Sequence, residues 1–312
     1  GEMSLYAENR RNRPYEFVHN TERKHANSEK CPFCGGHEAW TPDAIYQDGP
    51  NGAWQMRVFP NKFPTVREDC TDAAEEPFYT QTAGRGRHEI LVDTPDHDAT
   101  IDTFDAAHIA SILQVLQDRL HFFRNRADTQ YVQIFKNCGP DAGASIMHSH
   151  WQIMGVPVIP GEQENIMARS RKYELEKGGC IICDILSHEL ERGTRIVAEN
   201  EHFAAFAPFA SKLSYECNIA AKEHIPSFES FSEDMLYNLA EILKTVLSAT
   251  KTLRKGICYN LCFEDTPKGY DGHWYMRILP RMGNPAGFEY GTNSYINPIL
   301  PEDAAAYMRD KI

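Results

Sequence analysis

Runs of hydrophobic residues in the first half of the chain predict short strands on either side of a helix. Strands are expected at residues 54–59, 88–93 and 131–135, because each apolar run is bounded by turn-forming residues. Between the last two strands we expect a helix over about residues 103–124. Its apolar residues fall on one helical face, namely Phe104, Ile109, Ile112, Leu113, Leu116 and Leu120.

A glycine-rich turn at residues 139–143 leads into a segment in which His148, His150 and Gln152 occupy alternate positions. On an extended strand, this alternation would place all three polar side chains on one face. Backbone N–H groups of glycine-rich turns bind anions, and an imidazole can act as a nucleophile. The stretch therefore predicts a site for phosphate chemistry.

A second series repeats this order of elements. Residues 215–224 align with residues 88–97 without a gap, and both segments have Glu at the second position and His at the tenth. An amphipathic helix follows from Phe231, with Met235, Leu236, Leu239, Ile242, Leu243, Val246 and Leu247 on its apolar face. A strand near residues 257–263 and the segment 273–277 complete the series.

The repeat predicts a duplicated domain and an α+β fold. His97 and His148 are 51 residues apart, and their counterparts His224 and His273 are 49 residues apart. We expect a first domain at residues 1–160 and a second at residues 161–312, with the boundary near residues 161–178. Residues 5–30 are polar and without periodicity, so they are expected to form an extended lead-in.

Composition limits the possible partners. The chain has 312 residues, of which 42% are hydrophobic and 24% charged, as is typical of a soluble globular protein. A net charge of −12 argues against a nucleic-acid partner, which favours a basic surface. No run of about 18 apolar residues is present, so no membrane-spanning helix is expected.

The nine cysteines indicate metal binding more than a disulfide framework. Their number is odd and their density modest, which favours a reducing compartment and hence a cytoplasmic location. Four of them form two Cys-x-x-Cys pairs, Cys31/Cys34 and Cys180/Cys183. Such a pair can also be a thioredoxin-like redox motif, but histidines at matching distances from both pairs favour zinc.

The duplication groups these cysteines with histidines into two sets of the Cys₂His₂ type, which structural zinc favours. Two zinc ions per chain are therefore expected. His37, His88 and His188 are the alternatives if a histidine has been assigned wrongly. The two predicted ligand sets are Cys31, Cys34, His97 and His148, and Cys180, Cys183, His224 and His273.

The same alignment identifies the half that carries the chemistry. Tyr275 corresponds to His150 and Arg277 to Gln152, so the second half keeps one histidine, His273, and lacks the other. His148 is then a metal ligand, and His150 is free to attack a phosphorus centre. Double displacement through a nucleotidyl-histidine follows. Further donors to the phosphoryl oxygens are available from Gly143, Ser145 and Gln152.

These motifs together resemble the galactose-1-phosphate uridylyltransferase branch of the histidine-triad superfamily, over about residues 31–310. The resemblance implies two tandem histidine-triad-like halves, each an antiparallel sheet packed with helices, and a homodimer. The motifs that carry it are Cys31-Pro-Phe-Cys34, Phe59-Pro-Asn-Lys-Phe63, Thr94-Pro-Asp-His97, Phe135-Lys-Asn137, Gly143-Ala-Ser145, His148-Ser-His150-Trp-Gln152 and Gly287-Phe-Glu289.

The resemblance also implies roles for single residues. His150 would be the covalent nucleophile, and Gln152 stands where hydrolytic relatives carry a third histidine. The substrates would be a nucleotide sugar together with a sugar phosphate or phosphate. The nucleotide would contact Asn61, Asn137, Gly143, Ser145 and Gln152, and the hexose would lie near Phe288 and Glu289.

Three readings of the function stay open at this point. The first is a hexose-1-phosphate uridylyltransferase of the UDP-glucose/galactose-1-phosphate type. The second is an adenylyl-transferring enzyme, because the Cys180/Cys183 pair is similar to that of two-zinc ADP-glucose phosphorylases and Lys62 stands where many uridylyltransferases have Asp. The third is a zinc-stabilised binding module without catalysis, which leaves the His150/Gln152 pair unexplained.

Overall fold

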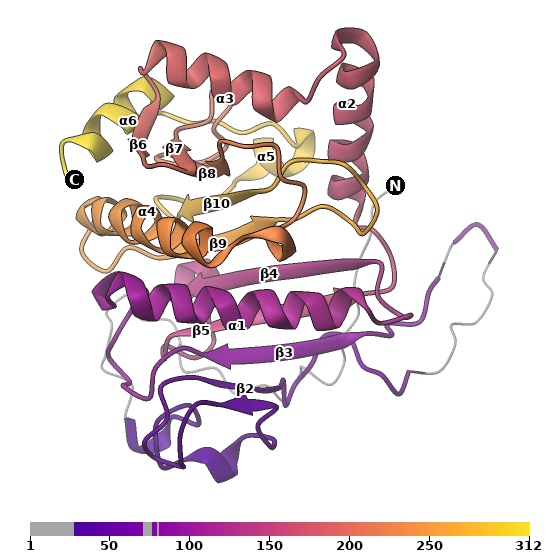
Figure 1. Cartoon of the computed structure of the whole chain (residues 1–312), viewed down its shortest axis with the longest axis vertical. Coiled ribbons are helices and arrows are strands. Elements are labelled where there is room, and N and C mark those ends of the chain that lie inside the picture. The colour runs from indigo at the N-terminus through magenta and orange to yellow at the C-terminus, as the bar shows by residue number, and fades with distance from the viewer. Residues whose placement is uncertain (1–27, 71–76, 80) are drawn as a thin grey trace.

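The described residues form one antiparallel sheet of ten strands, in the order β1-β2-β3-β5-β4-β9-β10-β8-β7-β6. The computed structural model (Figure 1) describes residues 28–70, 77–79 and 81–312. Residues 5–27 of the predicted lead-in lie outside them. The strands of the first half are β1 (Tyr46–Gln47), β2 (Arg57–Pro60), β3 (Arg87–Val92), β4 (Tyr131–Cys138) and β5 (His150–Val156). Those of the second half are β6 (Ile196–Glu199), β7 (Phe203–Phe206), β8 (Cys217–Ala221), β9 (Tyr259–Glu264) and β10 (Tyr275–Pro280).

Two long helices cover one face of this sheet and lie side by side, as Figure 1 shows for α1 (Ala106–Arg124) and α4 (Glu233–Thr252). Each begins directly after a capping side chain. Asp105 accepts a hydrogen bond from the backbone N–H of His108, and Ser232 accepts one from that of Met235. The cap explains why α1 begins at Ala106, although the apolar pattern extends back to Phe104.

Four shorter helices lie around this core, and with α1 and α4 they complete the α-helices of the described residues. They are α2 (Gly161–Lys177), α3 (Ile181–Arg192), α5 (Gly287–Thr292) and α6 (Pro301–Arg309). None of the described helices has both the length and the apolar character needed to cross a bilayer. All nine cysteines lie among the described residues, and no disulfide bond joins any of them.

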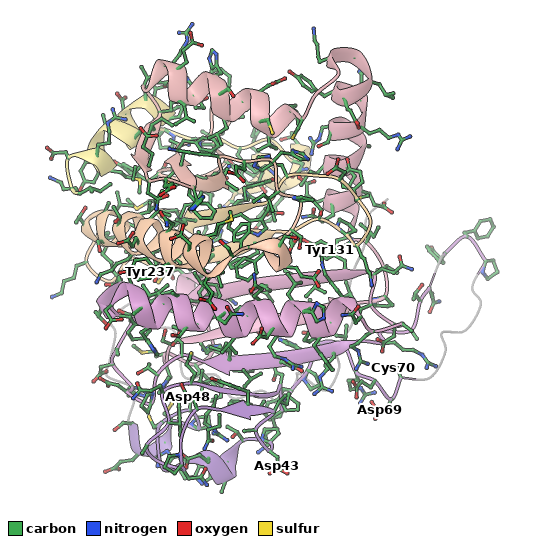
Figure 2. The ribbon with its side chains drawn as sticks, in the orientation of Figure 1. Asp43, Asp48, Asp69, Cys70, Tyr131 and Tyr237 are labelled. Atoms are coloured by element: carbon green, nitrogen blue, oxygen red, sulfur yellow. The ribbon has the colours of Figure 1, made fainter. Side chains whose placement is uncertain are left out.

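The main hydrophobic core lies between the two long helices and the sheet. Leu236, Leu239 and Leu243 of α4 are buried against it, whereas Tyr237 lies on the outer side of the helix (Figure 2). On the strands, alternate side chains point to opposite faces. Trp151 is fully buried beneath the helices, so its neighbours on β5, His150 and Gln152, face the other side of the sheet.

The order of strands is the same from either edge to the centre. From one edge the order is β1, β2, β3, β5 and β4, and from the other it is β6, β7, β8, β10 and β9. In both series the third strand precedes a long helix, and the fourth follows a histidine of a predicted metal set. β4 and β9 pair in the middle, with Phe135 opposite Cys262. This arrangement confirms the α+β class with two antiparallel halves.

The division at residue 160 stays a prediction, because both halves contribute strands to a single sheet. The predicted boundary segment forms α2. The strand expected from residue 54 begins only at Arg57, after Asp48 accepts hydrogen bonds from the backbone N–H groups of Gln55 and Met56.

Candidate functional site

The polar side chains of β5 line a pocket on the face of the sheet that the long helices leave free. Phe59, Ile90 and Gln152 lie in one row across β2, β3 and β5, and all three border the pocket. The pocket walls are formed by the segment after β2 and by residues 31–34, the turn between the first two cysteines, which we call the knuckle. The residues that line the pocket are Pro32, Phe33, Trp40, Thr41, Pro42, Phe59, Asn61, Lys62, Phe63, Ile90, Ser145, Ile146, His150 and Gln152.

His150 lines this pocket, and no hydrogen bond from the described residues engages its Nε2. Its Nδ1–H donates a hydrogen bond of 2.8 Å to the carbonyl oxygen of His148, so Nε2 carries the lone pair. The ring of Phe33 packs edge-on against it, with 5.2 Å between ring centroids. Burial lowers the pKa of His150 to about 4, and the imidazole is therefore neutral near pH 7. A neutral imidazole with an accessible lone pair is a competent nucleophile.

Gln152 is held by a histidine that the sequence patterns did not assign to this site. Oε1 of Gln152 lies 3.1 Å from Nε2 of His88, and the backbone N–H of Thr65 donates to Nδ1 of His88 over 3.2 Å. Asn61 lies beside the same ring, and Asn61 and Ser145 both line the pocket. Four predicted site residues therefore come together here, namely Asn61, Ser145, His150 and Gln152.

A buried ion pair lies on the opposite face of the sheet, near the ends of β3, β4 and β5. Nζ of Lys136 is 2.7 Å from Oδ2 of Asp93 and 2.8 Å from Oγ of Ser149, and all three side chains are buried. Ser149 also donates to Asp93 over 3.1 Å. Because Ser149 stands between His148 and His150, this network holds the backbone that carries both histidines.

The first predicted metal set is assembled by the fold. The ligand atoms of its four residues, Cys31, Cys34, His97 and His148, lie within 4.8 Å of one another. Cys31, Cys34 and His148 are buried, and His97 is half-buried. Sγ of Cys34 is 3.3 Å from Nδ1 of His97 and 3.6 Å from Nδ1 of His148. Tetrahedral zinc would hold sulfur and nitrogen ligands roughly 3.5 Å apart, given bond lengths of about 2.3 and 2.0 Å. The donor set therefore fits such an ion.

His148 lies just before β5, which begins at His150. The ring of Phe33 packs against both histidines, whereas the intervening Ser149 bonds to Lys136 and Asp93 on the opposite face, so the predicted alternation extends to His148. Nε2 of His148 bonds to the carbonyl oxygen of Thr94 at 2.7 Å, which turns Nδ1 towards the sulfur atoms. A carbonyl partner of this kind fixes the tautomer of a metal-binding histidine.

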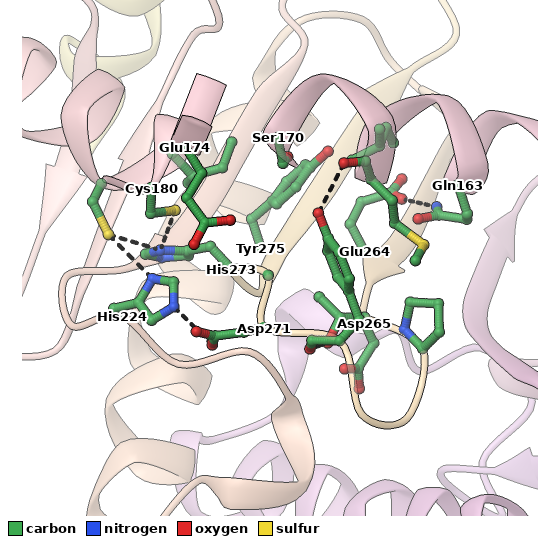
Figure 3. Close-up of a pocket in the computed structure, with 18 of the residues that line it drawn as sticks. Gln163, Ser170, Glu174, Cys180, His224, Glu264, Asp265, Asp271, His273 and Tyr275 are labelled. Atoms are coloured by element: carbon green, nitrogen blue, oxygen red, sulfur yellow. Dashed lines mark hydrogen bonds and ion pairs between the residues drawn. The ribbon is translucent and has the colours of Figure 1, made fainter. Parts of the chain in front are cut away.

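The second predicted set is also assembled but is less buried (Figure 3). Cys183 lies 3.4 Å from Nδ1 of His224 and 3.3 Å from Nδ1 of His273, and Cys180 completes the set. His273 bonds through Nε2 to the carbonyl oxygen of Ala221, as His148 does to Thr94. Burial and the nearby Cys180 raise the pKa of the Cys183 thiol to about 12, so a cation is needed to keep both thiolates.

A cavity of about 380 Å³ lies beside this second set, between α2 and the segment that joins β9 to β10 (Figure 3). Tyr275, the counterpart of His150, lines this cavity, so a phenol stands where the first half has its unligated imidazole. The carboxylates of Glu174, Glu264 and Asp271 make its lining acidic. The cavity therefore has the wrong charge for a phosphate group and no free histidine to react with one.

Four predicted residues lie outside the pocket of His150. Asn137 accepts a hydrogen bond from Asn260, and Gly143 closes a turn in the left-handed conformation. Glu289 caps its own helix by accepting from the backbone N–H of Ala286, and Phe288 is exposed on α5. The alternative ligands His37, His88 and His188 belong to neither metal set.

The turn before Ser145 depends on two glycines with positive φ, which provide a matched test. A Cβ on Gly139 (φ +87°) would lie 2.4 Å from Sγ of Cys258, whereas one on Gly143 (φ +81°) would meet nothing within 4 Å. We expect Gly143→Ala to cost about 1 kcal/mol from backbone strain and Gly139→Ala about 3 kcal/mol, because overpacking is added. Urea denaturation measures both, and equal losses would contradict the proposed clash.

Sequence comparison relates the chain to sugar nucleotidyltransferases. The profile of the galactose-1-phosphate uridyl transferase N-terminal domain matches residues 1–160, and a domain of unknown function, DUF4921, matches residues 96–312. The chain is 29% identical to an ADP-glucose phosphorylase of Arabidopsis thaliana, over 98% of this chain and 89% of that protein. It is 29% identical to a galactose-1-phosphate uridylyltransferase of Thermotoga maritima, over 90% of this chain and 89% of that protein.

Solved structures show the same fold. The crystal structure of an ADP-glucose phosphorylase from Arabidopsis thaliana with bound ADP-glucose superimposes with a TM-score of 0.81 and 29% identity, covering 90% of each chain. A uridylyltransferase structure gives a TM-score of 0.82 at 25% identity, covering 95% of this chain and 93% of the other.

Proposed function

Because the chain belongs to the galactose-1-phosphate uridyl transferase family, we propose that it transfers a nucleotidyl group from a nucleotide sugar through a covalent intermediate on His150. The two relatives described above are named as enzymes that act on such molecules. The observation that supports the proposal most strongly is the state of His150. Its imidazole is neutral, lies outside both metal sets and borders a pocket, with no described residue bonded to Nε2.

The first step is attack on the α-phosphorus of the nucleotide sugar. The lone pair on Nε2 of His150 forms an N–P bond, and the bond from that phosphorus to the bridging oxygen breaks. The oxygen leaves with the β-phosphoryl group, which releases a sugar 1-phosphate. Ser145 and Gln152, which line the same pocket, donate to the oxygens of the α-phosphoryl group as negative charge develops on them.

The second step transfers the nucleotidyl group to a phosphate-bearing acceptor. An oxygen of the acceptor attacks the phosphorus and His150 leaves as neutral imidazole, so the kinetics are ping-pong. A hexose 1-phosphate as acceptor with a uridylyl group gives a hexose-1-phosphate uridylyltransferase, our first proposal. Inorganic phosphate with an adenylyl group gives an ADP-glucose phosphorylase. The match to such an enzyme over 98% of this chain supports that second candidate.

We assign zinc to both metal sets, because two thiolates and two imidazoles suit this ion. Each ion would tie a Cys-x-x-Cys segment to the loops around the sheet. In the first half that segment includes Phe33, which contacts His150 and lines the pocket. The metal therefore supports the wall of the pocket, and no step of transfer passes through it.

The remaining substrate contacts follow the family motifs. Asn61 joins Ser145 and Gln152 as a nucleotide contact within the pocket. Asn137 near the end of β4 and Gly143 in the turn that follows are further proposed contacts. Phe288 and Glu289 on α5 are proposed to lie near the hexose. We further propose a cytoplasmic homodimer that acts on a nucleotide sugar and a sugar phosphate or phosphate, without a nucleic-acid or membrane partner.

Labelled substrates test this proposal and separate its two versions. The protein is incubated with UDP-glucose or ADP-glucose carrying ³²P at the α-phosphorus, and acid-labile label on the protein is measured. We expect label from one of them, preferentially UDP-glucose. The label should be lost in acid and kept in base, because a phosphoramidate on histidine is labile to acid and stable to base. Preferential label from ADP-glucose would support the phosphorylase. No label from either would favour the non-catalytic zinc module.

A further inference from the structure

We propose that His88 is a positioning residue that fixes the carboxamide of Gln152, so that its NH₂ group and not its oxygen meets the phosphoryl group. The inference rests on the proposed function, because it assigns the direction of one donor in the same pocket. His88 itself does not line that pocket. It acts through Gln152, with which it shares a hydrogen bond.

The tautomer of His88 follows from one unambiguous donor. A backbone N–H can only donate, and that of Thr65 lies 3.2 Å from Nδ1 of His88. Nδ1 is therefore an acceptor, and the proton of the neutral ring is on Nε2. This N–H is 3.1 Å from Gln152, and only the Oε1 end of that carboxamide can accept it.

The rest of the carboxamide is oriented by this bond. With Oε1 engaged, the NH₂ group of Gln152 occupies the other end, and no hydrogen bond from the described residues engages it. Gln152 is 4% exposed and borders the pocket together with His150. Its N–H groups are therefore available to a ligand. A rotated carboxamide would instead present a carbonyl oxygen to an anionic phosphoryl group, which is repulsive.

A second carboxamide, that of Asn61, contacts His88 in the opposite sense. Oδ1 of Asn61 accepts a hydrogen bond of 2.9 Å from the backbone N–H of Phe63, which directs its NH₂ group towards His88. That nitrogen lies 3.3 Å from Nε2 and 3.5 Å from Nδ1 of the His88 ring. His88 thus contacts two carboxamides, and the N–H groups that its contacts leave for a ligand are those of Gln152, because Asn61 directs its own NH₂ group at the ring. Donors set in advance stabilise developing negative charge without reorganisation.

Other roles for His88 do not fit its contacts. It belongs to neither metal set. Both ring nitrogens have partners, Thr65 on one side and Gln152 on the other, so the ring has no free lone pair with which to accept a proton from a substrate. It is 3% exposed and separated from the pocket by the carboxamides.

A double-mutant cycle tests the proposal. The rate at which His150 takes up ³²P-labelled nucleotide is measured for the wild type, His88→Phe, Gln152→Ala and the double variant. We expect His88→Phe to lower the rate roughly 10-fold and Gln152→Ala roughly 100-fold, as is typical of losing an oxyanion donor. The double variant should be no slower than Gln152→Ala, because His88 acts only through Gln152. The proposal would be overturned if the double variant lost the product of the two single losses in rate, or if His88→Phe labelled at the wild-type rate.

Two further measurements keep this result separate from folding and from the proposed function. His88→Gln retains an N–H near the position of Nε2 and should recover most of the rate, whereas a purely packing role would favour the phenylalanine. Nitrogen-15 NMR of the wild type, with His88 assigned by its absence in His88→Phe, should show a protonated Nε2 and a bare Nδ1. A protonated Nδ1 would overturn the inference, whether or not the wild type takes up label. Absence of label in the wild type would instead refute the proposed function.

Discussion

Replacing His150 by alanine should abolish nucleotidyl transfer while the protein keeps its fold and its metal. The N–P bond of the intermediate cannot form without Nε2, so labelling from the active nucleotide sugar should fall by on the order of 10⁴-fold or more. The loss of one buried hydrogen bond, from Nδ1 to the carbonyl oxygen of His148, should cost only about 1 to 2 kcal/mol. Label uptake, metal content and urea denaturation are the three measurements.

His188 provides the matched control, because it is an exposed histidine on α3 outside both metal sets. His188→Ala should label at the rate of the wild type. His148→Ala should show the opposite pattern to His150→Ala, with metal and stability lost. If His150→Ala loses metal and His148→Ala keeps it, the roles of the two histidines are reversed.

Removing a thiolate from each metal set should give two different phenotypes. Cys34→Ser should lose about one metal ion per chain and roughly 3 kcal/mol of stability, and should also slow labelling at least about 10-fold. The reason is that Phe33 is in the same knuckle and packs against His150. Cys183→Ser should lose a similar amount of metal but label at close to the normal rate, because no residue of its set lines the pocket of His150.

Metal analysis of the wild type sets the reference, and about two zinc ions per chain are expected from the two Cys₂His₂ sets. A wild type with one ion that Cys183→Ser retains would remove the second site. Equal slowing of labelling in Cys34→Ser and Cys183→Ser would show that the metals act on stability alone. The thermal midpoint of each variant separates these outcomes.

The sequence predicted two sets of metal ligands, and the fold brings the residues of each set together as a possible metal site. The reason is the repeat: two Cys-x-x-Cys pairs and two pairs of histidines at similar spacing can be matched without knowing how strands pair. The apolar faces of the two long helices could also be predicted, because helical periodicity is a local feature of the sequence. The resemblance to the uridylyltransferase family is confirmed by the match over residues 1–160.

The features that could not be predicted depend on partners distant in the chain. The ring of His148 is oriented by the carbonyl oxygen of Thr94, a residue 54 positions earlier. The contact of His88 with Gln152 joins residues 64 positions apart. Alternation places His88 and Ile90 on the same face of β3, and Ile90 pairs with Gln152, but that pairing becomes known only once β3 and β5 are neighbours.

The strand order also affects how copies of this protein can associate. Both outer strands are short: β1 has two residues, and β6 has four with an irregular register against β7. Arg309 of α6 donates to the carbonyl oxygen of Ile196, which occupies part of the outer β6 strand. Short or covered edges resist the edge-to-edge pairing that leads to aggregation. A second copy would therefore have to bind through helices, loops or the open face, and not by extending the sheet.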